Sequence, residues 1–339
     1  MRRSMLEAHE RATNMGRVEM TVGDFKSVWL DDCAGRLTPK TIHFYGWVCD
    51  LPMMKPMRAL NLNDVTPRQI AKTVAQVTEQ HGRRTGLAAF RTLSAMFGLA
   101  ERWGYLDTNP CRRMQAPTVP KREPTVPPPA VMERAIRTAT PEFGALLRFA
   151  ISSGCRRGEI AGVRWSDFND ELGIVTVRRS IDSTPGNGLA KETKTSRAKV
   201  ISLDPATLEA LEAHKARQTD QGRNNGWVWS RDHDGDTPLR PDLITSRWTS
   251  LRKRIPELEG VRFHDIRHAT ATWLIAAGMD PRTVADRLGH ENVQLTLSTY
   301  TAPVAASDRR AATIISDLLA AANGAAALAD LSDGERPRP

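Results

Sequence analysis

The stretch FHDIRHAT, residues 263–270, places three side chains that can hold an anion on one face of a predicted helix. His264, Arg267 and His268 stand at positions i, i+3 and i+4, which are neighbours on a helix surface. The apolar helical periodicity of this segment continues to Gly278. Taken alone, the pattern also fits a solvated basic face or a capped core histidine, so its meaning depends on the rest of the chain.

A second group of cations lies in SSGCRRGEIAGVRWSDF, residues 152–168. Arg156 and Arg157 follow a glycine break and open a predicted helix, with Glu159 in the same turn. A helix N-terminus favours anions, and a guanidinium beside it can hold two oxygens of one phosphate. The alternative is a surface arginine paired with Glu159 at i+3.

Three further candidates occur downstream in ETKTSRAKV and LGHENVQLTLSTYT. Lys194 is placed near the bend of a predicted β-ribbon, although by itself it is an ordinary exposed lysine. His290 ends a short predicted helix, and Tyr300 follows ten residues later between polar neighbours.

The chain has only three tyrosines. Tyr45 and Tyr105 lie beside Trp47 and Trp103 in N-terminal helical segments, where packing explains them. Tyr300 does not lie on an apolar stripe.

The net positive charge of the chain indicates an anionic partner. The 339 residues contain 48 Lys+Arg against 39 Asp+Glu, and residues 1–130 hold +7 of the net +9. Nucleic acid is the usual partner of such a balance.

The four cysteines form no CxxC or His/Cys cluster, and the acidic run 232–236 lacks the closing Glu of a calcium loop. Neither a signal sequence nor an 18-residue apolar run is present, so we expect a cytoplasmic protein without membrane spans.

A proline-rich linker divides the chain. APTVPKREPTVPPPA, residues 116–130, contains six prolines, which oppose helix and favour extended backbone. Before it, segments such as 65–77 begin with Thr then Pro, an N-cap followed by a first-turn proline. In the segment 84–104, Phe90, Leu93, Phe97 and Ala100 form one apolar stripe, predicted to be core. The stretch 20–115 is therefore predicted to be an all-helical domain, preceded by an N-terminal extension, 1–19.

The second domain is predicted over 131–324, followed by a disordered tail, 325–339. Thr-Pro and Asp-Pro signals predict helices at 141–153, 205–219 and 281–289. Alternating β-branched residues predict two strands in 173–180 and 189–203, joined by a turn-rich stretch. The predicted fold class is mostly α with a small β-ribbon or sheet in the C-terminal domain, an α+β arrangement.

The ordered set of Arg156, Lys194, HxxR at 264–267, LGH ending at 290 and Tyr300 resembles the tyrosine recombinase, or phage integrase, family over roughly residues 20–304. The resemblance implies that family's two-domain architecture, a helical core-site DNA-binding domain followed by a catalytic domain. In the family the first arginine stands two residues after a Gly and three before an acid. This assigns Arg156, with Arg157 as the alternative, and leaves His268 a structural neighbour.

The resemblance also implies the chemistry. Tyr300 would attack a phosphodiester and form a 3′-phosphotyrosine linkage, while Arg156, Arg267, His264 and His290 stabilise the transition state and Lys194 protonates the leaving oxygen. No cofactor, metal or ATP is expected. The chain carries no GxxxxGK[ST], GxGxxG or HExxH signature.

The implied partner is double-stranded DNA at core sites, contacted in the N-terminal domain by Arg83, Arg84 and Arg91. A homotetramer on paired sites is implied, with the C-terminal helix at 306–324 exchanged between protomers, and an accessory directionality factor is a further candidate. Only about 20 residues precede the first helix, so we expect a compact recombinase of the bacterial nucleoid that reads core sites only.

Two alternatives remain open at this point. One is a catalytically silent DNA-binding protein on the same fold. The other keeps the chemistry in an Xer-like resolvase or transposon recombinase. Resolvases of that kind usually place the Tyr nine residues after the His; the spacing here is ten, which favours an integrase that moves a phage or mobile element.

Overall fold

The computed structural model describes residues 19–120, 122–182, 190–192, 198–222, 226–231 and 237–289. Three predicted site residues, Lys194, His290 and Tyr300, lie outside the described residues, as do the segment 306–324 and both chain ends. The chain divides into two compact units between Arg122 and Glu123, inside the predicted linker. Each unit has a hydrophobic core of its own and is described separately.

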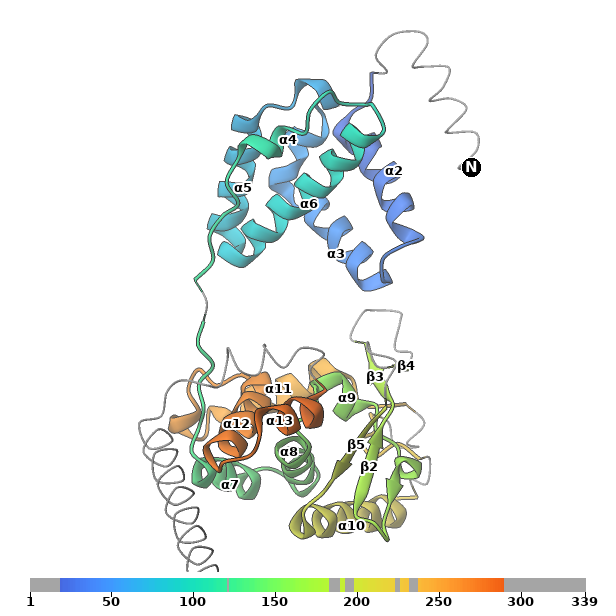
Figure 1. Ribbon diagram of the computed structural model, residues 1–339, viewed down its shortest axis with the longest axis vertical. Coiled ribbons are helices and arrows are strands. Elements are labelled where there is room, and N and C mark those ends of the chain that lie inside the picture. Colours follow the sequence, from blue (N-terminus) through green and yellow to red (C-terminus); the bar gives the residue numbers. More distant parts are fainter. Residues whose placement is uncertain are drawn as a thin grey trace, which may run out of the picture. The chain divides into compact units, whose positions relative to one another are not determined.

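The secondary structure described in the N-terminal unit is helical apart from one isolated bridge between Thr21 and Asn61 (Figure 1). Its elements are α2 (Val22–Ala34), α3 (Pro39–Asp50), α4 (Lys55–Arg58), α5 (Pro67–His81) and α6 (Arg83–Arg102), with 3-10 turns at Pro52–Met54, Leu62–Asp64 and Pro110–Arg113. The Thr-Pro helix starts are confirmed. Thr38 accepts a hydrogen bond from Thr41 N, and Thr66 accepts one from Gln69 N in a capping box.

The core of the N-terminal unit contains the predicted apolar stripe. Phe90, Leu93, Phe97 and Ala100 of α6 are all buried, as their spacing predicted.

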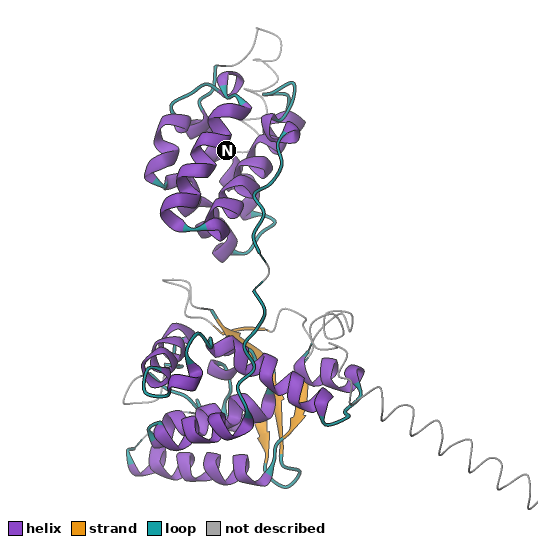
Figure 2. Cartoon of the chain, turned by 90° about the vertical axis from the view of Figure 1, so that its left-hand side faces the viewer, coloured by secondary structure: helices purple, strands orange, loops and turns teal. Residues whose placement is uncertain are grey.

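The C-terminal unit combines helices with two small sheets (Figure 2). Its helices are α7 (Pro129–Thr138), α8 (Pro141–Ser153), α9 (Arg157–Ala161), α10 (Pro205–Asp220), α11 (Pro241–Arg252), α12 (Phe263–Ala276) and α13 (Pro281–Leu288), with 3-10 turns at Trp165–Asp167 and Pro256–Leu258. Asp204 and Asp280 cap α10 and α13 as predicted. Helix α7 begins two residues inside the predicted linker, because Pro129 fits its first turn.

The predicted β-ribbon is present but is divided in two. Strands β1 (Phe168–Asn169), β2 (Ile174–Val177) and β5 (Lys199–Ser202) form one antiparallel sheet in the order β1-β2-β5, and β3 (Arg179–Ile181) pairs with β4 (Ala190–Glu192). In the first sheet Val177 lies opposite Lys199. The mostly helical fold with a small sheet is thus confirmed. None of the helices in the described part of the chain is long and apolar enough to cross a membrane.

Four chain segments meet at the end of α8. This helix stops at Gly154, whose left-handed φ of 62° turns the chain toward Arg156 and α9. Helix α12 packs along α8, where Thr270 Oγ1 donates to Ile151 O at 2.9 Å. The end of α13 is the fourth segment, and its Leu288 side chain packs directly on Gly154. A Cβ at Gly154 would lie 2.5 Å from Leu288 Cδ2. A larger residue at this turn would be strained and would displace Leu288.

Candidate active site

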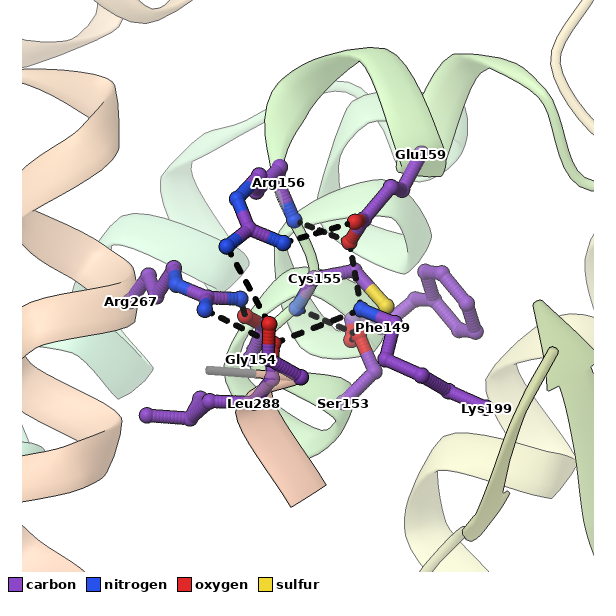
Figure 3. A network of polar contacts seen from close by, with 10 residues as sticks. Phe149, Ser153, Gly154, Cys155, Arg156, Glu159, Lys199, Arg267 and Leu288 are labelled. Atoms are coloured by element: carbon purple, nitrogen blue, oxygen red, sulfur yellow. Dashed lines mark hydrogen bonds and ion pairs between the residues drawn. The ribbon is translucent and has the colours of Figure 1, made fainter. Parts of the chain in front are cut away.

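Arg267 is the buried centre of this meeting point. It lies on α12 and is 3% exposed. Its Nη1 donates to Gly154 O and its Nη2 to Leu288 O, each at 2.7 Å. A buried guanidinium costs free energy unless its donors find acceptors, and these two carbonyls supply them. The side chain thereby ties the end of α8 to the end of α13 (Figure 3).

Arg156 faces Arg267 from the N-cap position of α9 (Figure 3). Its Nη1 pairs with Glu159 Oε1 at 3.0 Å, and its Nη2 donates to Gly289 O at 3.3 Å. The pairing with Glu159 that the i+3 spacing suggested is therefore present, together with a place in the cluster. The side chain remains 45% exposed, so the guanidinium can still meet a ligand.

Arg157 points to a different neighbour. Its Nη1 donates to Thr245 Oγ1 on α11, and the Asp242 carboxylate lies close enough to act on its charge. Burial lowers the pKa of this guanidinium, an effect that Asp242 opposes. Of the two candidate arginines, Arg156 is the one that joins Arg267.

Glu159 and Lys199 form a buried ion pair beneath the arginines. Lys199 Nζ lies 2.6 Å from Glu159 Oε2, and the two side chains are 10% and 4% exposed. Desolvation alone would raise the pKa of Glu159, but the charge and hydrogen bond of Lys199 and the contacts from Arg156 together hold it below its usual value. The carboxylate is therefore ionised. Sequence reasoning missed Lys199; its only signal is a cation within the predicted strand 189–203.

His264 lies one helical turn before Arg267. Its ring centroid is 5.0 Å from that of His268, in an edge-to-face arrangement. The ring keeps an exposed part, yet the surrounding protein removes enough water to lower the pKa of His264 to about 4, with the charges of His268, Arg267 and Arg156 adding to the effect. At neutral pH the imidazole is thus uncharged and can donate one hydrogen bond.

Arg156, Arg267 and His264 therefore form one donor cluster. Two guanidinium groups carry its positive charge, and its ionised carboxylate, Glu159, is occupied by Lys199 and Arg156. A tetrahedral anion such as a phosphodiester is the ligand that this charge and geometry suit. Among the described residues no group of His, Cys, Asp and Glu could hold a metal ion. Gly289, the last described residue, immediately precedes His290.

The tyrosines of the N-terminal unit pack against aromatic side chains, as predicted. Tyr45 stacks on Trp29 at 4.9 Å, and Tyr105 lies 5.3 Å from Phe25. Trp47 and Trp103 are instead among the exposed large hydrophobic residues. Tyr45 and Trp47 lie two residues apart on α3, so their side chains point to different faces of the helix.

The three N-terminal arginines predicted to meet DNA are exposed on α6. Arg83 and Arg84 open this helix, and Arg91 lies seven residues after Arg84, on the same face. Within the described residues none of the three forms an ion pair with a carboxylate. No carboxylate in the described part of the unit therefore pairs with their charge.

Comparison with known proteins places this geometry in a family. Residues 131–306, just over half of the chain, match the phage integrase family. A tyrosine recombinase XerC-like protein of Caldanaerobacter subterraneus is 24% identical over 341 residues, covering 90% of this chain and 85% of its own. The ICEBs1 integrase of Bacillus subtilis is 26% identical over 235 residues, covering 65% of this chain and 64% of its own.

Solved structures share the fold. The Tn1549 transposon integrase in complex with a circular intermediate DNA aligns with a TM-score of 0.74 at 18% identity, covering 87% of this chain and 99% of that one. A lambda integrase tetramer bound to a Holliday junction aligns with a TM-score of 0.64 at 18% identity, covering 85% and 81%. The chain belongs to the phage integrase family. It is a tyrosine site-specific recombinase, an enzyme of DNA recombination.

Proposed function

We propose that this recombinase cleaves and rejoins DNA through a 3′-phosphotyrosine intermediate at the cluster built on Arg156, Arg267 and His264. The observation that carries the proposal is the grouping of these side chains where α8 and α13 end: Arg156 and Arg267 bind backbone carbonyls there, and the charges of both act on His264. Negative charge accumulates on the nonbridging oxygens of phosphorus as the nucleophile attacks, and fixed donors stabilise it there. Each such donor contributes a factor of about 10² to 10³ in rate.

Tyr300 is the proposed nucleophile. Its phenol loses its proton to solvent as its oxygen forms a bond to phosphorus and the bond to the DNA 5′-oxygen breaks, and Lys194 gives that leaving oxygen a proton. The phosphodiester energy is kept in the new linkage, so strand exchange is the same reaction reversed on another 5′-hydroxyl. His290 adds a further donor to the phosphate. Support for these three roles is their order and spacing relative to Arg156 and Arg267.

Double-stranded DNA is the proposed partner of both units. In the N-terminal unit, Arg83, Arg84 and Arg91 are proposed to bind backbone phosphates, which fix register without reading sequence. A homotetramer on paired core sites, with the segment 306–324 exchanged between protomers, is the proposed working assembly. The lambda integrase tetramer on a Holliday junction is a precedent on the same fold. An accessory directionality factor is a further proposed partner.

Integration or excision of a phage or mobile element is the proposed task. The ten-residue spacing between His290 and Tyr300 favours it, as do the integrases among the similar proteins. Resolution of chromosome dimers is the second candidate, favoured by the XerC proteins to which the chain is also similar. The sequence of the DNA that flanks the gene distinguishes these two tasks, because attachment-like repeats accompany integration.

The chemistry is tested with a nicked core-site substrate, in which loss of a short 5′-hydroxyl fragment traps the covalent intermediate. The parent should give a slow-migrating protein–DNA band on a denaturing gel. Tyr300→Phe removes one oxygen and little volume, so it should bind the substrate and give no band. A band of equal strength from the phenylalanine variant would exclude Tyr300 as the nucleophile.

A further inference from the structure

Lys199 occupies a position that the proposed chemistry does not use. It is the first residue of β5, and its ammonium is buried between α9 and the end of α13. Besides Glu159, it reaches Leu288 O at 3.5 Å. The aliphatic part of Lys199 packs on Gly289, since a Cβ at Gly289 would lie 2.5 Å from Lys199 Cδ. One side chain thus contacts two separate elements of the candidate site, α9 and the end of α13 (Figure 3).

The end of α13 is held by three cations from three elements. Arg267 and Lys199 both donate to Leu288 O, and Arg156 donates to Gly289 O. The last carbonyls of a helix have no partner within the helix and carry partial negative charge, so cations stabilise them. The chain that continues to His290 therefore leaves from a point fixed by the same arginines that are proposed to hold the phosphate.

Several charged or titratable groups among the described residues surround Lys199. Glu159 faces it from α9, Arg156 from the helix cap and Arg267 from α12, while the buried Cys155 thiol also senses its charge. His264 lies within reach of the Arg156 charge. Glu159 is the only carboxylate among these groups. It therefore balances Lys199 and Arg156 together.

We infer that Lys199 is a positioning residue for recombination: its ammonium pairs with Glu159 at 2.6 Å, and Glu159 in turn holds Arg156 in the orientation needed to receive the phosphate. The inference rests on the proposed function, because it assigns Arg156 to the phosphate. Lys199 itself, buried beneath the arginine layer, does not touch DNA. It acts through Glu159 and through the end of α13.

This role has a consequence that a purely structural contact lacks. Without the ammonium, burial is no longer opposed by the strongest source of positive charge, so the pKa of Glu159 rises. Once protonated, the carboxyl group loses the ionic part of its pairing with Arg156. Loss of Lys199 should therefore make cleavage sensitive to acid at pH values where the parent is insensitive.

The experiment measures single-turnover formation of the covalent adduct by the full-length chain from about pH 5.5 to about pH 9. Lys199→Met removes the charge and keeps most of the volume. Lys199→Arg keeps the charge, and Lys253→Met removes an exposed lysine at the end of α11 as a matched control. A double variant, Lys199→Met with Glu159→Gln, removes the carboxyl group that would titrate. Core-site affinity and thermal unfolding are measured alongside.

For Lys199→Met we expect the acid-side midpoint of cleavage to move up by about one pH unit or more, with core-site affinity within about threefold of the parent. Lys199→Arg and Lys253→Met should keep the parental midpoint, and the double variant should recover it. A uniform loss at every pH, or a shifted midpoint that persists in the double variant, would overturn the inference. If the parent forms an adduct and Lys199→Met matches it at all pH values, only this inference fails; if the parent forms none, the proposed function fails first.

Discussion

At the scale of single residues, the two adjacent arginines at the start of α9 have different surroundings. Arg156 contacts Glu159 and the end of α13, whereas Arg157 contacts Thr245 of α11. Sequence spacing ranked the first above the second but left both open. The different directions of their side chains now make the choice testable with one pair of substitutions.

Arg156→Lys keeps the charge but loses the planar fork that can hold two phosphate oxygens. We expect cleavage of the nicked substrate to fall by about two orders of magnitude, while core-site affinity stays within a few-fold. Arg157→Lys is the matched control and should retain cleavage within a few-fold. The reverse ranking in a single-turnover assay would transfer the phosphate-binding role to Arg157.

His264 links the cluster to folding stability. Its pKa is lowered to about 4 in the folded chain, below the ordinary value of 6.5. As the pH falls, the unfolded chain therefore takes up a proton before the folded chain does. The stability that neutral His264 contributes is complete above about pH 6.5 and is lost as the pH falls toward 4. The pKa of His268 is lowered too, chiefly by burial, and adds to the same trend.

Unfolding by urea at a series of pH values should show stability of the C-terminal unit decreasing from about pH 6.5 toward pH 4. In His264→Asn the decrease should be shallower, since one of the two histidines no longer titrates. Identical slopes for the parent and the variant would contradict the lowered pKa.

At the scale of elements, the end of α13 depends on a glycine. Gly289 has φ +66°, and a Cβ there would meet Lys199. Gly260 has φ +73° but nothing within 4 Å of a Cβ, which makes it a control in the same unit. The comparison separates backbone strain from displacement of the lysine.

Both Gly289→Ala and Gly260→Ala should lose about 1 to 2 kcal/mol of unfolding free energy, because alanine is strained in the left-handed region. Only Gly289→Ala should also slow adduct formation, as it displaces Lys199 from Glu159. Equal cleavage by the two variants, measured at a temperature where both are folded, would show that the contact with Lys199 is not needed.

Element starts were predictable because their causes are local. A Thr or Asp followed by Pro satisfies the first free amides of a helix within four residues, and α3, α5, α8, α10 and α13 all begin this way. The short β1 strand and the break between β2 and β3 were not predicted, since they depend on pairing with distant segments.

The site itself was only partly predictable. Arg156, His264 and Arg267 could be chosen from their motifs, but the carbonyls that Arg267 binds at Gly154 and Leu288 could not. Lys199 was missed for the same reason. Its partner Glu159 is 40 residues away, and a strand lysine gives no sign of which face it occupies until the register is known.

At the scale of the whole molecule, the excess positive charge of the first 130 residues, +7 of +9, determines how DNA binding should respond to salt. Each phosphate neutralised by a cation adds about 0.9 to the slope of log affinity against log salt. Binding to a core site should therefore weaken steeply as salt rises, and a nearly flat dependence would contradict a phosphate-binding N-terminal unit.

Replacing Arg83 and Arg84 together with glutamine should weaken binding and lower the salt slope by about 1.8. Both side chains are exposed, so stability should stay close to that of the parent. Exposed Arg36 pairs with Asp32 on α2, and its glutamine variant serves as a control with little effect on the slope. Unchanged salt slopes for both variants would exclude the predicted contact of Arg83 and Arg84 with DNA.

The central claim is that Tyr300 becomes joined to a DNA 3′-phosphate, and peptide mapping of the trapped adduct tests it most directly. The adduct is digested with protease and nuclease, and the peptide that keeps a nucleotide is sequenced by mass spectrometry. We predict a single modified residue, Tyr300, carrying a 3′-linked nucleotide and leaving a free 5′-hydroxyl on the released strand. A nucleotide on Tyr45, Tyr105 or a serine, or a 5′-phosphate linkage, would contradict the proposed mechanism.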